Sequence, residues 1–283
     1  NNNVVKGNFI GTNASGTAAV FNYFGVVLMN GTEGNVIGGA TAAERNLISG
    51  NFGYGIWTGD DPSTPGINIT ANNQIIGNYI GTDINGTTEI FLQSLGILID
   101  QYSSNNIIGG ELPGMGNLIS GHSLGSGIQF QGPDNSGHQV LGNLIGTDAS
   151  GTTAVGNMQG VAVGFGTKNV VIGGTSAGAR NVVSGNAGAG ILIQDEGSTG
   201  NEVLGNYIGT DISGAAGLGN DNGIGILNGA AQNSIGGVSE GAGNLISGNS
   251  FIGLQLQGIN TTDNLVLGND IGVDASGTYA ISN

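Results

Sequence analysis

The chain of 283 residues contains no cysteine, which excludes disulfide bonds and thiolate metal sites. Its only strong cations are Lys6, Arg45, Lys168 and Arg180, against 19 acidic residues, so the formal net charge is −15. Because nucleic-acid binding needs cations to neutralise phosphates, we expect no nucleic-acid partner. We also expect no membrane insertion, since no apolar run approaches the roughly 18 residues of a spanning helix.

Proline is scarce, with four residues, whereas glycine is abundant, with 59. The glycines follow no strict Gly-X-Y period, and this excludes collagen. Hydrophobic residues make up 38% of the chain, which argues against a flexible linker. A glycine every few residues also disfavours helices, because each one costs a helix about 1 kcal/mol.

Two strings repeat along the chain and organise it. A GN-x-IGT-like string begins at Gly7, Gly77, Gly142, Gly205 and Gly268, and an IGG string begins at Ile37, Ile108, Ile172 and Ile235. Short apolar runs separated by Gly, Asn, Asp and Ser predict strands of about four residues joined by turns. Constant spacing without intervening helices predicts a coil in which each turn gives one strand to each of three parallel sheets. We expect about eight to nine coils in a single domain over residues 1–283, which looks like an uncapped segment or a fibre subunit.

A finer pattern, Asn-x-Ile/Val, accompanies this period. Stacked coils would place these residues above one another, where their side-chain amides can hydrogen-bond to each other as a ladder. Asn also tolerates the left-handed backbone conformations that occur at corners. The predicted ladder comprises Asn8, Asn46, Asn78, Asn117, Asn143, Asn181, Asn206, Asn244 and Asn269.

The repeated unit, Gly-Ile-x-Ile followed by Asn-x-Val-x-Gly-Asn-x-Ile, resembles the right-handed parallel β-helix repeat of the pectate-lyase-like superfamily over nearly the whole chain. The combination IGGTSAGARNVVSGN … GNYIGTD is similar to repeats of large secreted bacterial surface proteins. The resemblance implies the right-handed all-β solenoid fold. It leaves function open, since the superfamily includes polysaccharide lyases, hydrolases, adhesins and plain stalks.

The aspartate of the repeated turn raises the question of a metal. A Ca²⁺ site wants six to eight oxygens, usually with two or more carboxylates. Each turn offers one Asp, so a turn in which Asp accepts backbone N–H bonds is favoured over a Ca²⁺ site, and we expect no cofactor. The positions concerned are Asp83, Asp148, Asp211 and Asp274, with Asn13 in the first copy. An outward threonine column suited to ice binding is a further alternative, formed by Thr12, Thr82, Thr147 and Thr210.

Asp60 and Asp61 are the alternative catalytic pair, close to Tyr54 and Trp57 as candidate carbohydrate-binding rings. Glycoside hydrolysis needs two carboxyls about 5–9 Å apart across one bond. His122 takes the place of an Asn two coils later, at another corner, so no catalytic set converges. Residues 54–61 are nevertheless where a lyase, hydrolase or carbohydrate-binding site would lie.

Arg45 and Arg180 share one position in the repeat, where loop-to-loop salt bridges are expected. Five Asn-x-Ser/Thr sequons are candidate N-glycosylation sites if the protein is secreted. They are Asn13, Asn30, Asn68, Asn85 and Asn260.

The sequence as a whole favours an extracellular or cell-surface structural protein, a stalk, adhesin rod or filament-forming fibre, over an enzyme. Its expected partners are other copies of itself, end to end, and a polysaccharide. The alternative is a polysaccharide lyase, glycoside hydrolase or carbohydrate-binding module with its site near residues 54–61.

Overall fold

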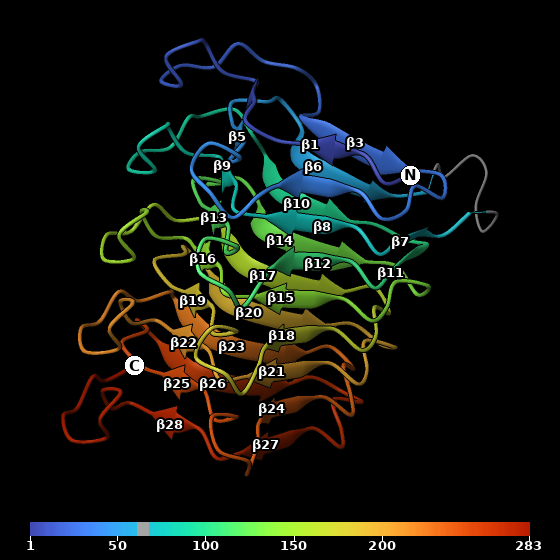
Figure 1. Cartoon of the computed structure of the whole chain (residues 1–283). Coiled ribbons are helices and arrows are strands. Elements are labelled where there is room, and N and C mark those ends of the chain that lie inside the picture. Colours follow the sequence, from blue (N-terminus) through green and yellow to red (C-terminus); the bar gives the residue numbers. More distant parts are fainter. Residues whose placement is uncertain (61–67) are drawn as a thin grey trace.

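The computed structural model describes residues 1–60 and 68–283, which form parallel strands and no helix. The chain passes through sheets 1, 2 and 3 in turn and then begins the next coil, so that each strand pairs in parallel with the equivalent strands of the coils before and after it (Figure 1). This is a right-handed parallel β-helix: the repeats predicted the coil of three parallel sheets, and the family resemblance implied its hand. The described residues hold no helix of the length and apolarity needed to cross a membrane.

Sheet 1 has short strands of two or three residues. In spatial order they are β1 (Val4–Val5), β4 (Val36–Gly38), β8 (Gln74–Ile76), β12 (Ile107–Gly109), β15 (Gln139–Leu141), β18 (Val171–Gly173), β21 (Glu202–Leu204), β24 (Ser234–Gly236) and β27 (Leu265–Leu267).

Sheet 2 has strands of two residues each. They are β2 (Phe9–Ile10), β5 (Leu47–Ile48), β9 (Tyr79–Ile80), β13 (Leu118–Ile119), β16 (Leu144–Ile145), β19 (Val182–Val183), β22 (Tyr207–Ile208), β25 (Leu245–Ile246) and β28 (Asp270–Ile271).

Sheet 3 has the longest strands, of four to six residues. They are β3 (Val26–Met29), β6 (Tyr54–Gly59), β10 (Leu95–Ile99), β14 (Ser126–Gln131), β17 (Gln159–Gly164), β20 (Ala189–Gln194), β23 (Asn222–Leu227) and β26 (Ile252–Gln257). A small fourth sheet pairs β7 (Thr70–Ala71) with β11 (Ser103–Ser104) at the corner that leads from sheet 3 back to sheet 1.

The strands therefore differ in length, whereas the sequence predicted about four residues throughout. A glycine with left-handed backbone ends the short ones: Gly38 (φ +94°) closes β4, and Gly11 (φ +87°) follows β2. A Cβ on Gly38 would lie 1.9 Å from the Ile76 carbonyl oxygen on the next coil. Close stacking of the corners thus requires glycine and fixes where these strands stop.

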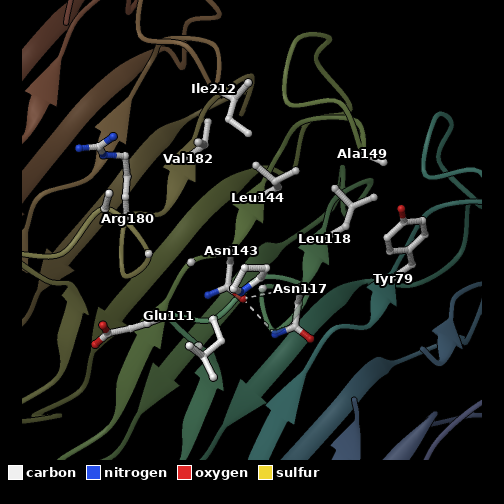
Figure 2. A pocket seen from close by; sticks show the side chains of 18 of the residues that line it. Tyr79, Glu111, Asn117, Leu118, Asn143, Leu144, Ala149, Arg180, Val182 and Ile212 are labelled. Atoms are coloured by element: carbon white, nitrogen blue, oxygen red, sulfur yellow. Dashed lines mark hydrogen bonds between the residues drawn. The ribbon is translucent and has the colours of Figure 1, made fainter. Parts of the chain in front are cut away.

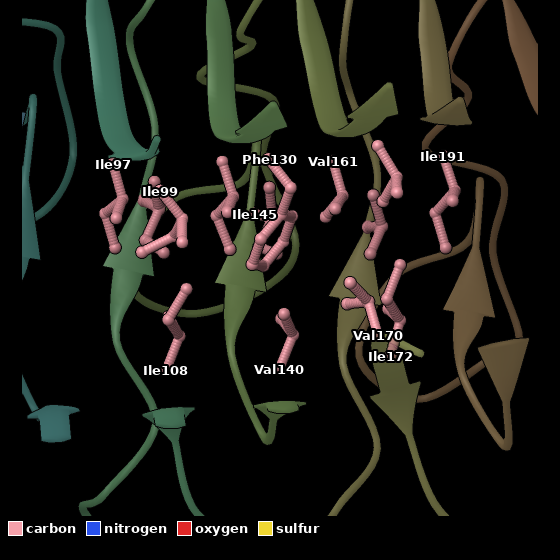
Figure 3. Packing of buried hydrophobic residues seen from close by; sticks show 14 of the residues in the cluster. Ile97, Ile99, Ile108, Phe130, Val140, Ile145, Val161, Val170, Ile172 and Ile191 are labelled. Carbon is pink, nitrogen blue, oxygen red and sulfur yellow. The ribbon is translucent and has the colours of Figure 1, made fainter. Parts of the chain in front are cut away.

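The core is a set of aliphatic columns that point inward from the three sheets (Figure 3). In sheet 1 the central residue of each strand is buried, as with Ile108 and Val140, which pair directly. Sheet 3 contributes two inward residues per strand, such as Ile97 and Ile99 on β10. Each coil buries its own aliphatic side chains against the next, so the apolar interior is continuous along the rod.

Polar columns follow all three corners between the sheets. At corner 1, from sheet 1 to sheet 2, each asparagine donates from Nδ2 to the Oδ1 of the next, for example Asn78 to Asn117 at 3.0 Å. The column contains the nine asparagines of the sequence pattern, from Asn8 to Asn269. Each amide also reaches a main-chain carbonyl, as Asn78 does with Ile37 at 2.9 Å, and therefore satisfies otherwise unpaired backbone groups.

The other two columns were not foreseen in full, because residues other than Asn interrupt them. Corner 2, from sheet 2 to sheet 3, contains Asn22, Asn51, Gln93, His122, Asn157, Asn186, Asn220, Asn249 and Asn283. Corner 3, from sheet 3 to sheet 1, contains Asn3, Asn35, Asn73, Asn106, His138, Val170, Asn201, Asn233 and Asn264. Both histidines of the chain thus occupy ladder positions.

Candidate functional site

The repeated Asp turns are held by main-chain hydrogen bonds. Asp83 Oδ1 accepts the N–H groups of Thr87 at 2.7 Å and Thr88 at 3.1 Å. Burial raises the pKa of the Asp83 carboxyl, but hydrogen bonds from Thr87, Thr88 and Asn85 together bring the pKa below its usual value. The same two bonds recur at Asp148, Asp211 and Asp274, and Asn13 accepts them in the first copy. Within the described residues, no group of three His, Asp or Glu side chains is placed to hold a metal ion.

The threonines that precede these turns are buried or, at Thr12, half-buried, which corrects the outward column that the sequence suggested. Thr82, Thr147 and Thr210 are fully buried, and the hydroxyl of each donates to the carbonyl of the following aspartate. The reason is that each threonine bridges to the returning arm of its own turn, as Thr82 does with Glu89. An ice-binding face is therefore not available at this column.

Successive Asp turns contact one another although they occur on alternate coils. The Ile84 N–H donates to the Gly16 carbonyl at 2.9 Å, and the Ala149 N–H donates to the Gly86 carbonyl at 2.8 Å. The same contact joins Ile212 to Gly151. The turns thus form a continuous wall along the outer side of sheet 2.

A second wall is formed by the corner loops, which we define as residues 39–45, 110–116, 174–180 and 237–243. These loops stack closely: a Cβ on Gly178 would lie 2.2 Å from the Glu111 carbonyl oxygen. The Ser176 hydroxyl also donates to the Glu111 carboxylate at 2.9 Å. Glycine at the stacking position therefore lets one loop rest on the loop before it.

Between the two walls lies a groove of about 560 Å³. Figure 2 shows Leu118, Leu144 and Val182 side by side on successive strands of sheet 2, where they form its floor. Glu111 and Arg180 lie on the side of the corner loops, and Ile212 lies on the side of the Asp turns. The groove follows the long axis of the solenoid, so it suits an extended ligand more than a compact one.

Two arginines line this groove, and each lies over a tyrosine ring of the next strand. The Arg45 guanidinium carbon is 3.9 Å from the centre of the Tyr79 ring, and that of Arg180 is 4.1 Å from the centre of the Tyr207 ring. These cation–π contacts hold the arginines in place. The prediction of salt bridges at Arg45 and Arg180 is wrong. Among residues 1–60 and 68–283 the ion pair found is that of Lys6 with Glu44.

The Nε–H groups of the two arginines differ in their hydrogen bonding. Arg180 Nε donates to the Gly205 carbonyl at 3.2 Å. Arg45 Nε has no hydrogen-bond partner among the described residues. The sequence contains a signal for these pairs: Arg precedes the corner 1 asparagine in the two copies whose next strand of sheet 2 begins with Tyr, and glycine stands there in the other two copies, at Gly116 and Gly243.

The candidate residues near 54–61 lie elsewhere, on sheet 3. The rings of Tyr54 and Trp57 are 5.8 Å apart and nearly perpendicular, and both contact Phe24. Asp60 follows β6 and is buried, whereas Asp61 lies outside the described residues. His122 is at corner 2, away from the end of β6, and its ring bonds Gln93 and Asn157.

The five sequons all lie in turns or corners. Asn30, Asn68, Asn85 and Asn260 are exposed. Asn13 is half-buried, and its side-chain Oδ1 accepts the N–H of Thr17 at 2.9 Å. Glycosylation of these positions stays a prediction.

Comparison with known proteins gives likeness in structure alone. No protein-family model and no curated protein sequence matches the chain. The periplasmic alginate epimerase AlgG is similar in structure, with a TM-score of 0.56 and 15% identity over 87% of this chain and 47% of that chain. An alginate lyase from Paenibacillus sp. matches with a TM-score of 0.45 and 16% identity over 86% of this chain and 87% of that chain. The likeness to the epimerase shows the parallel β-helix fold, and the chain spans about half the length of the epimerase.

The expectation of a non-catalytic stalk, adhesin rod or fibre subunit is wrong by this comparison. The solved structure that shares this fold is named as an alginate epimerase, so the fold does not mark a non-catalytic rod. Regular coils had suggested a purely structural rod, but regularity belongs to the fold and is compatible with an enzyme. End-to-end association stays a prediction.

Proposed function

We propose that the protein binds an acidic polysaccharide in the groove over sheet 2 and acts on it outside the cytoplasm. The observation that supports this proposal best is the placement of Arg45 and Arg180, two of the four strong cations of the chain, in one groove. Arginine presents several N–H donors in a planar fork that matches a carboxylate. Two arginines against one lining carboxylate, Glu111, give the groove a local positive charge in a chain of net charge −15, which favours an anionic polymer there.

The spacing of the two arginines favours a polymer over a small molecule. Arg45 precedes β5 and Arg180 precedes β19, which are four strand steps apart in sheet 2. At about 4.8 Å per step, the arginines are separated by about 19 Å along the axis. A chain of sugars that carries repeated carboxylates could reach both, and an apolar sugar face could rest on the half-buried Leu144.

The chemistry we propose is modification of a uronate unit. An arginine bound to a sugar carboxylate stabilises negative charge that develops there when the adjacent carbon loses a proton. Tyr79 lies directly against Arg45, and we propose that its hydroxyl donates a proton back to that carbon, while water accepts the proton that leaves and restores the hydroxyl. The name of the epimerase with this fold agrees with a polysaccharide substrate, and its periplasmic location agrees with a protein that works in the periplasm or beyond it.

Calorimetric titration with oligomers of uronic acids and of neutral sugars tests the binding. We expect Arg45→Gln and Arg180→Gln each to weaken uronate binding about tenfold, the equivalent of about 1.4 kcal/mol. Lys168→Gln is the matched control, because it removes the same charge from an exposed position outside the groove. Equal losses in all three variants, or no uronate binding by the native protein, would contradict the proposal.

Activity is tested separately by incubating the native protein and Tyr79→Phe with the same uronate polymer. Nuclear magnetic resonance of the products distinguishes a changed sugar configuration from a new double bond. We expect Tyr79→Phe to keep its binding and lose most of its turnover. A variant with undiminished turnover would remove Tyr79 from the chemistry and leave the binding proposal intact.

A further inference from the structure

A second pocket, of about 310 Å³, lies along corner 2 near the N-terminal end. Aromatic rings dominate it: Tyr23, Phe24, Phe52, Tyr54 and Phe91 line it over neighbouring coils. Several of these rings are open to solvent, since Tyr23 is 64% exposed, Phe52 54% and Phe91 56%. An exposed group of large rings on a chain with few aromatics marks a binding surface rather than chance.

The rings are arranged as walls instead of a flat stack. Tyr23 and Phe24 are perpendicular with centres 4.7 Å apart, whereas Phe24 and Tyr54 are nearly parallel at 5.2 Å. Phe24 also contacts Trp57, at 5.0 Å. The mutual contacts hold the rings in fixed orientations before any ligand arrives, which reduces the entropy cost of binding.

The backbone departs from the repeat at this pocket. Leu92, which lines it, has a φ of +114°, a conformation that a branched side chain rarely adopts. The next residue, Gln93, replaces asparagine in the corner 2 column, and His122 replaces it on the following coil. Strain and broken regularity in one place are typical of functional sites, because they are kept only where another requirement offsets their cost.

The chemical character of the lining indicates the ligand. Its polar groups are the hydroxyls of Tyr23, Tyr54 and Ser94, and no Asp, Glu, Lys, Arg or His lines the pocket among the described residues. A charged ligand would find no counter-charge here, and the acidic chain around it would repel an anion. A pyranose ring has an apolar face of C–H groups and a hydroxylated edge, which match aromatic rings with a few hydroxyls beside them.

We propose that the pocket of Tyr23, Phe24, Phe52, Tyr54 and Phe91 binds an uncharged sugar unit of a glycan, as a site separate from the arginine groove. The two sites share no lining residue. They also differ in chemistry, since carboxylates are bound at one and neutral rings at the other. The pocket would therefore hold the protein on a neutral glycan whether or not the groove is occupied.

The emission of Trp57, the single tryptophan, provides a local readout because its ring contacts both Phe24 and Tyr54. Titration of the full chain with neutral gluco-, manno-, galacto- and xylo-oligosaccharides is expected to shift this emission for at least one of them. Phe52→Ala and Phe91→Ala should each weaken that binding about tenfold. The matched control is Phe251→Ala, which removes an aromatic ring, 72% exposed, from the same corner far along the rod.

Thermal unfolding of each variant shows whether it is folded. If Phe52→Ala does not fold, Phe91→Ala alone tests the pocket. The inference is overturned if no neutral oligosaccharide binds, if the pocket variants bind like Phe251→Ala, or if only a hydrophobic dye enters the pocket. Because Arg45→Gln leaves the pocket untouched, it should bind neutral sugars normally. Failure of this inference and failure of the groove proposal are therefore distinguishable.

Discussion

The corner 2 column differs between the two ends of the solenoid. From Asn157 to Asn283 the column consists of asparagines alone, each donating to the next. Toward the N-terminal end it passes through Gln93 and His122, and the aromatic pocket lies on these coils. Uniform coils satisfy the hydrogen-bonding needs of the rod itself, whereas the departures from asparagine in this column fall on the coils that carry the aromatic pocket.

His122 can stand in the column because a neutral imidazole has one donor and one acceptor. Asn157 Oδ1, 2.7 Å from His122 Nδ1, belongs to an amide that itself donates to Asn186, so Nδ1 carries the hydrogen. His122 Nε2 then accepts from Gln93 Nε2 at 2.9 Å. The direction of the hydrogen-bond chain is thus preserved through the ring.

The largest effect is expected from breaking the uniform part of a column. Asn206 Nδ2 donates to Asn244 and to the Ile172 carbonyl, and its Oδ1 accepts from Asn181. Asn206→Leu would leave these buried groups without partners, and we expect it to lower the free energy of unfolding by about 3–5 kcal/mol. Chemical denaturation measures the loss. A loss below about 1 kcal/mol would mean that the column contributes little.

The irregular coils are expected to respond to pH. Burial lowers the pKa of His122 and of His138 to about 4, against hydrogen bonds that act in the opposite sense. Since each folded pKa lies below the unfolded value of about 6.5, stability is full above pH 6.5 and falls as the pH drops toward 4. The expected loss is on the order of 3 kcal/mol per histidine.

His122→Asn and His138→Asn sharpen this comparison by making the columns uniform. We expect each variant to remove about half of the pH dependence between 6.5 and 4, measured as midpoints of denaturation. The Asp turns lose stability only at lower pH, because the pKa of Asp83 is below its usual value and these carboxylates stay ionised in that window. A double variant with unchanged pH dependence would contradict the role of the histidines.

A smaller effect is expected where the corner loops stack. Gly178→Ala places a Cβ against the Glu111 carbonyl and must push one loop away from the other, at a cost of about 1–3 kcal/mol. Ala43, at the same position of the first loop, is the matched site, and Ala43→Gly should change stability by less than about 1 kcal/mol. Denaturation of both variants checks the difference. Gly178→Ala should also weaken uronate binding, because it displaces a wall of the groove.

The smallest effect is expected at the Asp turns. Asn13 accepts the same two main-chain hydrogen bonds as the aspartates, from Thr17 and Ala18. Asp211→Asn should therefore cost less than about 1 kcal/mol, whereas Asp211→Ala, which loses both bonds, should cost about 1–2 kcal/mol. Thermal denaturation of Asp211→Asn and Asp211→Ala measures the two losses of stability. Equal losses would indicate that the carboxylate charge matters more than its hydrogen bonds.

The sequence alone determined the β-helix and the corner 1 column, because each coil repeats one local pattern of aliphatic, glycine and asparagine positions. Asn78 and Ile80 could be assigned to corner and core from their spacing. Corners 2 and 3 were missed in part because His122, His138 and Val170 hide the repeat at those positions.

Only the tertiary structure decided where the grooves and pockets lie. Arg45 meets Tyr79, and Phe24 meets Tyr54, across coils that are about 30 residues apart in sequence, and such contacts depend on how loops stack in space. A local pattern repeats because every coil needs the same corners and core. What the outer faces bind depends on side chains that the repeat itself does not specify.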